Sequence, residues 1–185
     1  MTQSAHGLQE STAIQGVYFK PIRAFPDNRG IFREAFRREW FPWVNFDQIQ
    51  SNHSVSHAGV VRGLHYHFKQ IDFWYVTSGV IRVGMVDLRA SSPTFMKSQT
   101  LEIGDTNEIG VFIPEGVAHG FYAVTNASMI YYVNQHYTDG SDENSVAWND
   151  PDLGVAWNIS GDPIVSPRDA DAPRFRDLPP EKQPK

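Results

Sequence analysis

The chain contains no cysteine among its 185 residues, which excludes disulfide frameworks and thiolate chemistry. No apolar run approaches the ~18 residues of a membrane-spanning helix. The N-terminal stretch also lacks the apolar core of a signal peptide. Acidic residues outnumber basic ones, 21 to 16, which argues against nonspecific nucleic-acid binding. We therefore expect a cytoplasmic protein with neither a nucleic-acid nor a membrane partner.

The chain is instead rich in short β-prone runs. Hydrophobic residues make up 41% of it and aromatic residues 13%, as in globular proteins. From Gly16 onward the runs are bounded by Gly, Pro, Asp or Asn, and they include VYFKPI, IDFWYVTSG, VIRVGMVDL and SMIYYVNQHY. Their length and spacing predict an all-β barrel with a ligand in its mouth. We expect a flexible N-terminal arm (1–14), the barrel (15–160), and a C-terminal wrap with a disordered tip (161–185).

Two blocks carry histidines at notable spacings. The first, GVVRGLHYHFKQIDFWYVTSG, holds His65, His67 and Asp72, and the second, GVFIPEGVAHGFYAVTN, holds His119 after a Pro-x-Gly turn. Residues two apart in a strand point to one face, so His65 and His67 should project together. A single histidine in a β protein is more often structural than functional. Two blocks in this order, however, resemble the paired motifs of cupin jelly-roll barrels and favour a functional site.

Seven ordered stretches, between about residues 16 and 175, resemble the dTDP-4-dehydrorhamnose 3,5-epimerases and related nucleotide-sugar epimerases. They are DNRGIFREAF, QSNHS, GVVRGLHYH, SPTF, IPEGVAHGF, WNDPDLGVAW and SPRDADAP. The resemblance implies a cupin jelly-roll barrel, a homodimer with strands paired across its interface, and no cofactor. The implied substrate is a dTDP-4-keto-6-deoxyhexose. It would be inverted at C3, C5 or both by proton abstraction to an enolate and reprotonation on the opposite face.

The resemblance also implies the catalytic residues. It makes His65 the base, Asp169 the carboxylate that orients the His65 imidazole, and Tyr132 the acid on the opposite face of the sugar. Neighbouring Tyr131 takes the place of Tyr132 if the strand register differs by one residue, because such a slip exchanges the two faces of a strand.

Further positions are implied to bind the substrate. Arg29 and Glu34 match nucleobase contacts that often reach into the neighbouring subunit, and Arg62 suits bidentate contact with a diphosphate. The full implied set is Arg29, Glu34, Gln50, Asn52, Arg62, Lys69, Asp72, His119 and Arg168.

Two departures from the family matter. His65-Tyr66-His67 stands where the family usually has HFQ, and the second departure is at Asp72. Asp72 stands where the family carries a lysine that stabilises the enolate. A carboxylate there would oppose the developing charge by about 4 kcal/mol, taking like charges ~4 Å apart at an effective dielectric of ~20. In one explanation Lys69 bends into the pocket and replaces the missing cation. In another the chain is a family member with altered activity, such as a mono-epimerase or a nucleotide-sugar binding protein without turnover.

The third explanation is a metal site. Imidazole and carboxylate ligands from two strands suit one divalent ion, and a metal would restore electrophilic help to the enolate oxygen. The function would then be a metal-dependent cupin isomerase or oxygenase. A metal-bound His65 cannot act as a base, so the two schemes compete for one side chain. The candidate ligands are His65, His67, Asp72 and His119.

Overall fold

The computed structural model describes residues 6–185, which form two facing sheets and a separate hairpin. The first sheet has the order β1 (Gln9–Glu10), β2 (Tyr18–Pro21), β10 (Ile109–Ile113), β7 (Asp72–Ser78), β12 (Ala127–Val133) and β5 (Gln50–Ser56). The second has the order β13 (Asn144–Ser145), β6 (Val60–Tyr66), β11 (Val117–Ala123), β8 (Val80–Asp87) and β9 (Ser98–Gly104), with β14 (Ile164–Val165) beside β6. The predicted all-β barrel is confirmed.

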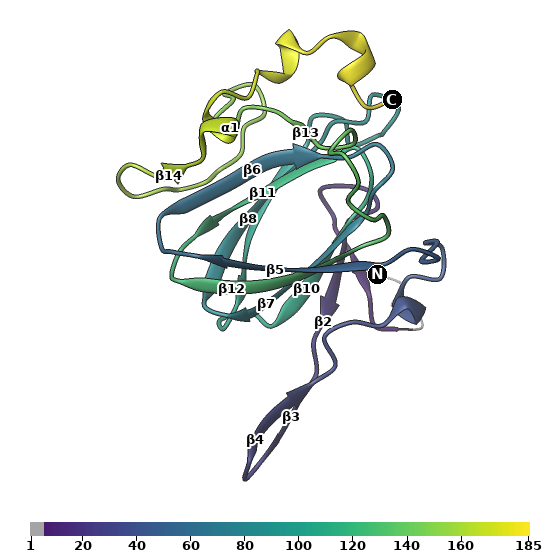
Figure 1. Cartoon of the computed structure of the whole chain (residues 1–185), viewed down its shortest axis with the longest axis vertical. Helices are drawn as coiled ribbons and strands as arrows, with labels where there is room; N and C mark the ends of the chain where they lie inside the picture. Colours follow the sequence, from purple (N-terminus) through teal and green to yellow (C-terminus); the bar gives the residue numbers. More distant parts are fainter. Residues whose placement is uncertain (1–5) are drawn as a thin grey trace.

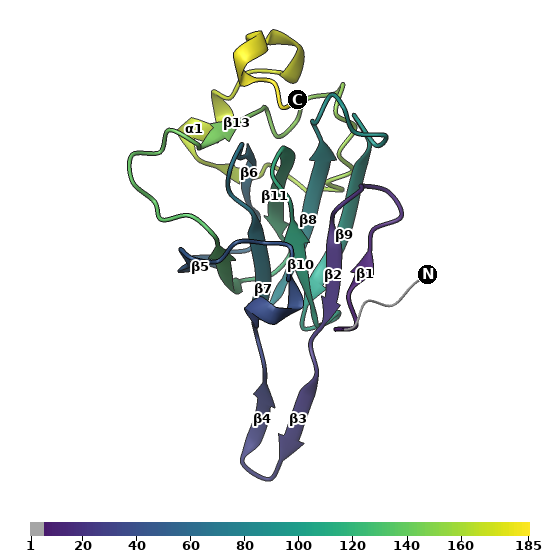
Figure 2. The same cartoon turned by 90° about the vertical axis from the view of Figure 1, so that its right-hand side faces the viewer.

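The remaining elements are short and lie outside the two sheets. The hairpin of β3 (Ala24–Asp27) and β4 (Gly30–Arg33) extends away from the barrel, as Figures 1 and 2 show. The helical turns are η1 (Arg38–Trp40), α1 (Pro167–Ala170), η2 (Phe175–Asp177) and η3 (Pro180–Lys182). No helix within residues 6–185 is long and apolar enough to cross a membrane.

The barrel interior is divided between an apolar part and a polar part. The apolar part is a cluster of buried side chains from both sheets, among them Val76, Val83, Met85 and Met129. The polar part contains His67, Asp72 and His119, which are also buried. Burying polar groups is costly unless they are hydrogen-bonded, so this part of the interior has a role other than packing.

Part of the outer face of the first sheet, over β7 and β10, is also buried. An aromatic cluster covers it, in which Phe36, Trp40 and Phe41 from the segment after the hairpin pack on Phe73 and Phe112. Strand β7 is therefore buried on both faces over its first five residues. Such a strand has no alternation of polar and apolar residues from which its inner face can be predicted.

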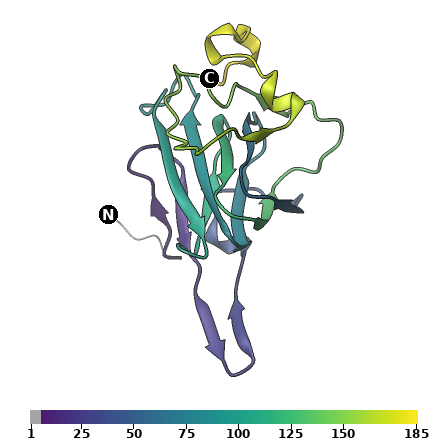
Figure 3. The ribbon, with the colours of Figure 1, turned by 90° about the vertical axis from the view of Figure 1, so that its left-hand side faces the viewer.

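The C-terminal segment covers the outer face of the second sheet (Figures 1 and 3). Phe175 and Leu178 pack there with Leu64, and the Tyr66 hydroxyl donates to the Lys182 carbonyl at 2.6 Å. The predicted disordered tip is thus packed against the barrel. The apolar residues of this segment are separated by prolines and short helical turns, so they show no helix or strand periodicity in the sequence. Packing therefore could not be predicted from their pattern.

Part of the segment predicted to be a flexible N-terminal arm is instead packed against the barrel. Strand β1 within it pairs with β2, and Leu8 and Ile14 are fully buried. Residues 1–5 of the predicted arm lie outside the described residues.

A bulge in β6 determines which of its residues face the interior. His119 is paired with His65 and Phe121 with Arg62, so a step of three residues in β6 opposes a step of two in β11. The extra residue reverses the alternation of the strand. As a result Arg62 and His65, three residues apart, line the same cavity.

Gly63 makes this bulge possible. Its φ is +108°, and an added Cβ would lie 2.7 Å from both the Gly120 Cα and the His119 carbonyl oxygen. Both contacts are with backbone atoms, which cannot rotate away.

Gly63→Ala should therefore lower the free energy of unfolding by about 2–3 kcal/mol through overpacking and backbone strain. The matched control is Gly161→Ala, where φ is +78° but no atom lies within 4 Å of the added Cβ. The control should lose only about 1 kcal/mol. Urea unfolding measures both, and equal losses would contradict a steric role for Gly63.

Candidate active site

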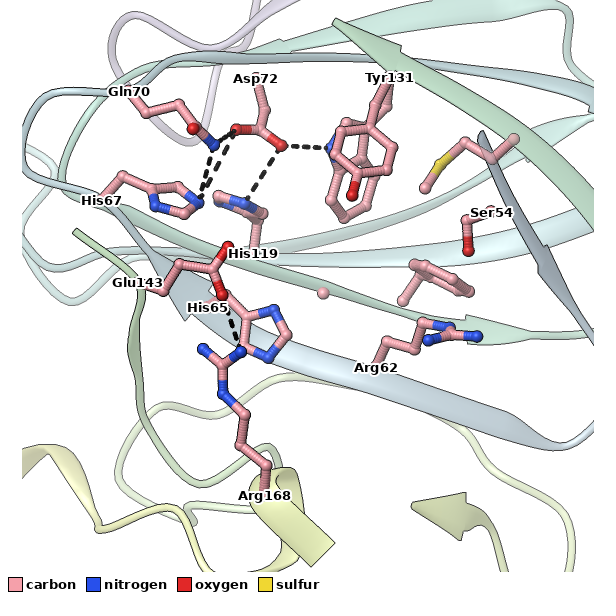
Figure 4. Close-up of a pocket in the computed structure, with 14 residues that line it drawn as sticks. Ser54, Arg62, His65, His67, Gln70, Asp72, His119, Tyr131, Glu143 and Arg168 are labelled. Atoms are coloured by element: carbon pink, nitrogen blue, oxygen red, sulfur yellow. Dashed lines mark hydrogen bonds and ion pairs between the residues drawn. The ribbon is translucent and has the colours of Figure 1, made fainter. Parts of the chain in front are cut away.

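A cavity of about 240 Å³ lies between the two sheets at the polar end of the barrel. Figure 4 shows its residues, which come from both sheets, from the β6–β7 connection, from the segment between β12 and β13, and from α1. The lining residues are Ser54, Arg62, His65, His67, Gln70, Asp72, Trp74, His119, Gly120, Phe121, Met129, Tyr131, Glu143 and Arg168.

His65 is held from behind by Asp169. The distance between His65 Nε2 and Asp169 Oδ1 is 2.7 Å, and the Gly63 amide donates to Asp169 Oδ2 at 3.2 Å. Asp169 is itself positioned in α1, where its amide donates to the Ser166 hydroxyl. Since Nε2 donates to the carboxylate in this arrangement, the neutral ring has its lone pair on Nδ1.

The environment of Asp169 keeps it ionised. Burial alone would raise the pKa of its carboxyl, but the hydrogen bond and charge of His65, with the bonds from Gly63 and Ser166, lower that pKa overall. The fixed negative charge lies beside the His65 ring and holds it in one orientation.

Tyr131, rather than Tyr132, faces His65 across the cavity (Figure 4). Tyr132 lies on the outer face of β12, stacked on Phe36 with ring centroids 4.4 Å apart. Successive residues of a strand point to opposite faces, so the two tyrosines cannot both face the cavity. The structure therefore places Tyr131 in the cavity and Tyr132, the residue predicted from the resemblance, outside it; Tyr131 is the alternative that a one-residue shift of register implies.

The hydroxyl of Tyr131 is suited to remain protonated at neutral pH. Burial raises its pKa, and the nearby carboxylates of Asp72 and Glu143 raise it further, with a smaller opposing effect from Arg62. A protonated phenol can donate a proton to a carbanion or enolate beside it.

His67, Asp72 and His119 meet at the closed end of the cavity. Asp72 Oδ1 lies 3.9 Å from His67 Nε2, and Asp72 Oδ2 lies 3.8 Å from His119 Nε2. Gln70 Nε2 and Trp74 Nε1 each donate to Asp72 at 2.9 Å. Burial lowers the pKa of His119 to about 4 although the charge of Asp72 opposes this shift, so His119 and Asp72 do not form an ion pair at neutral pH.

Two explanations for the Asp72 substitution do not fit this geometry. Lys69 does not line the cavity but a neighbouring one formed with the segment 135–143, and within residues 6–185 it makes no ion pair with Asp72. The four-ligand metal set is also corrected. The three residues whose ligand atoms lie within 4.8 Å of one another are His67, Asp72 and His119, without His65.

Two arginines stand at the edges of the cavity. Arg62 donates from Nε to the Ser56 hydroxyl at 3.0 Å and from Nη2 to the Val55 carbonyl at 3.4 Å. A guanidinium has five N–H donors, so others remain for a ligand. Arg168 donates to Glu143 at 2.8 Å, and both side chains are partly exposed. Both arginines were predicted from sequence, whereas Glu143 was not.

Besides Lys69, four predicted binding residues do not line this cavity. Arg29 is at the exposed tip of the β3–β4 hairpin, paired with Asp27, and Glu34 pairs with Arg37 beside the hairpin. Gln50 and Asn52 lie on β5 and share a hydrogen bond of 2.8 Å. Asn52 is paired directly with Tyr131 in the sheet, so it lies beside the cavity without lining it.

The sequence family described as dTDP-4-dehydrorhamnose 3,5-epimerase matches residues 11–177. A relative of that name from Neisseria gonorrhoeae is 37% identical over 162 residues, which are 85% of this chain and 49% of the relative. This chain thus spans about half the length of that relative. The chain belongs to the dTDP-4-dehydrorhamnose 3,5-epimerase family.

Two solved structures extend the comparison. The Legionella pneumophila epimerase RmlC, in complex with dTDP-4-keto-L-rhamnose, superposes with a TM-score of 0.88 at 29% identity, covering 96% of this chain and 97% of that one. ChmJ, a 3'-monoepimerase from Streptomyces bikiniensis in complex with dTDP-quinovose, gives 0.83 at 30% identity and covers 91% and 88%. These likenesses confirm the predicted family, the cupin-like jelly-roll fold and the isomerase class. They do not favour a metal-dependent cupin isomerase or oxygenase, or a nucleotide-sugar binding protein without turnover.

Several residues that line the cavity were not predicted from the sequence. Ser54 could have been, because it lies two positions after Asn52 on β5, and Trp74 because it lies two positions after Asp72 on β7. Glu143 carries no such signal, since it lies in the irregular segment between β12 and β13.

Asp169→Asn should reduce stability in a pH-dependent way. Because the folded-state pKa of Asp169 is lowered, its stabilising contribution is present above the ordinary pKa of about 4 and is lost as pH falls through the folded-state value. The variant should be about 1–2 kcal/mol less stable than wild type at pH 7, and the difference should shrink below about pH 4. Urea unfolding across this range measures it, with the exposed Asp162→Asn as control. A difference that does not change with pH would contradict the assignment.

Proposed function

We propose that this protein epimerises a dTDP-linked 4-keto-6-deoxyhexose at carbon atoms next to the ketone. The observation that supports this most strongly is the placement of His65 and Tyr131 on opposing sheets, facing one cavity from two sides. Inverting a carbon requires removal of a proton from one face and delivery to the other, so the two groups must flank the substrate.

His65 is proposed as the base. Its Nδ1 takes the proton from the carbon α to the ketone, while Nε2–H remains hydrogen-bonded to Asp169. The buried carboxylate stabilises the imidazolium that forms and holds the ring in one orientation. General-base catalysis of this kind typically contributes about 10²–10⁴-fold to the rate.

Tyr131 is proposed as the acid. Its protonated hydroxyl delivers a proton to the opposite face of the enolate carbon. The resulting phenolate then regains a proton from solvent, and the His65 imidazolium releases to solvent the proton that it took from carbon. Because the two groups act on different faces, loss of one does not affect both half-reactions equally.

The cavity edges are proposed to hold the diphosphate. Arg62 and Arg168 offer planar guanidinium groups, which suit phosphate oxygens. Glu143 competes for Arg168 in the structure described here, and the diphosphate would replace it as partner. Gln50 and Asn52, next to this cavity on β5, are proposed to contact the sugar or base.

We propose C3 as a carbon that this protein inverts, because the names of both kinds of relative include that position. One kind is named a 3,5-epimerase and the other a 3'-monoepimerase, so inversion at C3 is shared by their names. Exchange at C5 is measured in the same experiment as exchange at C3.

Incubation of the dTDP-4-keto-6-deoxyhexose in D₂O, followed by NMR, tests this mechanism. His65→Asn should lower both deuterium incorporation and inversion by about 10²–10⁴-fold. Tyr131→Phe should lower inversion by a similar factor but retain more of the exchange, because His65 can return deuterium to the face it deprotonated.

Tyr132→Phe is the matched control. It removes the same hydroxyl from the neighbouring residue, which faces the outer aromatic cluster, and activity should remain within about threefold of wild type. Wild-type protein that gives no exchange above a protein-free sample would overturn the proposed function. A Tyr132→Phe loss larger than that of Tyr131→Phe would overturn the assignment of the acid.

We also propose a homodimer in which the β3–β4 hairpin contacts the partner subunit. The hairpin exposes three large apolar side chains, Phe25, Ile31 and Phe32, at 40%, 56% and 66%. It extends beyond its own barrel (Figure 1), and it carries Arg29 far from its own cavity. A partner would cover these side chains and bring Arg29 to a second active site.

Phe32→Glu should convert the dimer to a monomer. Light scattering on eluting protein should give twice the 20.9 kDa chain mass for wild type and the single chain mass for the variant. Ile164→Glu, at a similarly exposed apolar residue outside the hairpin, should remain dimeric. A monomeric wild-type protein, or a dimer unaffected by Phe32→Glu, would contradict the proposed interface.

A further inference from the structure

A buried carboxylate at the closed end of the cavity has no cation of its own. Asp72 is 3% exposed, and its hydrogen bonds come from two neutral donors, Gln70 Nε2 and Trp74 Nε1, each at 2.9 Å. In the described part of the chain it pairs with no lysine or arginine, and the basic side chains nearest to it are His67 and His119. Burying a charge is costly unless it is paired. A cation that reached this point from the cavity would complete the pairing.

The two histidines at this point present acceptors rather than donors. Nδ1 of His67 donates to the Asp142 carbonyl oxygen and Nδ1 of His119 to the Val117 carbonyl oxygen, each at 2.9 Å. In a neutral imidazole the other nitrogen, Nε2, then carries a lone pair. The Gln70 amide nitrogen, which only donates, lies 3.2 Å from His67 Nε2 and is consistent with that tautomer. Burial lowers the pKa of His119 to about 4, so that ring is neutral at pH 7.

One of these lone pairs is open to the cavity. His119 is 4% exposed, and its Nε2 makes no hydrogen bond within residues 6–185, although every fully buried side-chain nitrogen or oxygen there has a partner. This atom is therefore reached from the cavity that His119 lines. Asp72 also has capacity left, because an ionised carboxylate offers about four lone-pair sites and accepts only from Gln70 and Trp74. Both acceptors are available to a donor on a bound ligand.

The spacing of the acceptors suits an ammonium group. Acceptors about 2.8 Å from one ammonium nitrogen, in tetrahedral directions, lie about 4.6 Å apart. One acceptor atom each from His67, Asp72 and His119 lies within 4.8 Å of the other two. His67 Nε2 is 3.9 Å from Asp72 Oδ1, whereas His119 Nε2 is 3.8 Å from Asp72 Oδ2, so the two rings flank different oxygens of the carboxylate. An ammonium with three N–H donors can contact several of these atoms at once, whereas a hydroxyl group has one donor.

We infer that the natural substrate carries a protonated amino group, which donates to Asp72 and His119. This inference rests on the proposed epimerase function and names its substrate class, a dTDP-linked 3-amino-3,6-dideoxyhexose with a ketone at C4. The arginines proposed to hold the diphosphate on C1 lie at the edges of the cavity, so the far side of the sugar ring faces the closed end. On that side C4 is the ketone and C5 carries the methyl group. C3 is therefore the carbon left to carry the amine.

The amine accounts for a carboxylate where the family carries a lysine. An ammonium on C3 lies next to the C4 oxygen, so its positive charge stabilises the enolate. Asp72 then holds and neutralises that ammonium instead of opposing the enolate. The cation beside the enolate thus belongs to the substrate rather than to the protein. Hydrogens remain at C3 and C5, so the proton transfers assigned to His65 and Tyr131 are unchanged.

A matched pair of ligands tests the inference by isothermal titration calorimetry. Both are dTDP-6-deoxyglucose compounds without a ketone, so they do not react. One carries an amino group at C3 and the other a hydroxyl group. At about pH 6.5, where the amine is protonated, wild-type protein should bind the amino compound at least tenfold more tightly, as expected of one added charge-assisted hydrogen bond.

Three variants locate the preference. Asp72→Asn keeps the shape of the side chain but removes its charge, so the ratio of the two dissociation constants should fall close to one. The control Asp162→Asn removes an exposed carboxylate outside the cavity and should keep the wild-type ratio. The double variant His67→Gln with Asp72→Lys restores both family residues and should reverse the preference in favour of the hydroxyl compound, which a misfolded protein cannot do. Circular dichroism checks the folding of each variant.

A wild-type ratio below tenfold would overturn the inference, and so would a preference that Asp72→Asn retains. Deuterium exchange separates this outcome from failure of the proposed function. The 4-keto substrate with a C3 hydroxyl should still exchange, but more slowly than its 3-amino counterpart. Exchange of the hydroxyl substrate without any amino preference would leave the epimerase function standing and remove only the amine. Absence of exchange with both substrates would remove the epimerase function itself.

Discussion

The hydrogen bond between His65 and Asp169 joins segments 104 residues apart and is the contact on which the site depends. It requires the bulge at Gly63, which turns His65 toward the cavity, and it requires the C-terminal segment to lie over β6. The Gly63 amide itself donates to Asp169. The carboxylate therefore fixes both the tautomer of His65 and the backbone two residues before it.

The two covered outer faces of the barrel serve this arrangement. The C-terminal segment brings Asp169 to His65, while the aromatic segment after the hairpin packs on the other sheet and holds β12 in register. That register determines that Tyr131, rather than its neighbour, faces the cavity. Packing on the outer face of the sheet thus accompanies the placement of one phenol inside the cavity and the other outside it.

The family and the all-β barrel could be predicted from the sequence. So could most of the polar side chains that line the cavity from the second sheet. His65, Arg62 and His119 lie in motifs whose spacing is informative, and Asp169 followed from resemblance. The sequence does not distinguish Tyr131 from Tyr132, because both are aromatic and both faces of their strand are packed. Composition therefore does not indicate which of the two tyrosines points inward. The exclusion of His65 from the polar cluster depends on a hydrogen bond with a residue distant in sequence, which no local spacing encodes.

A crystal structure with a dTDP-sugar reduced at C4 tests most directly whether the reacting carbon lies between His65 and Tyr131. Such a ligand has no acidic hydrogen next to a ketone and so remains intact. We expect C3 within about 3–3.5 Å of His65 Nδ1 on one face of the ring, with the Tyr131 hydroxyl at a similar distance on the other. A sugar bound with both groups on the same face, or with neither near a ring carbon, would contradict the account.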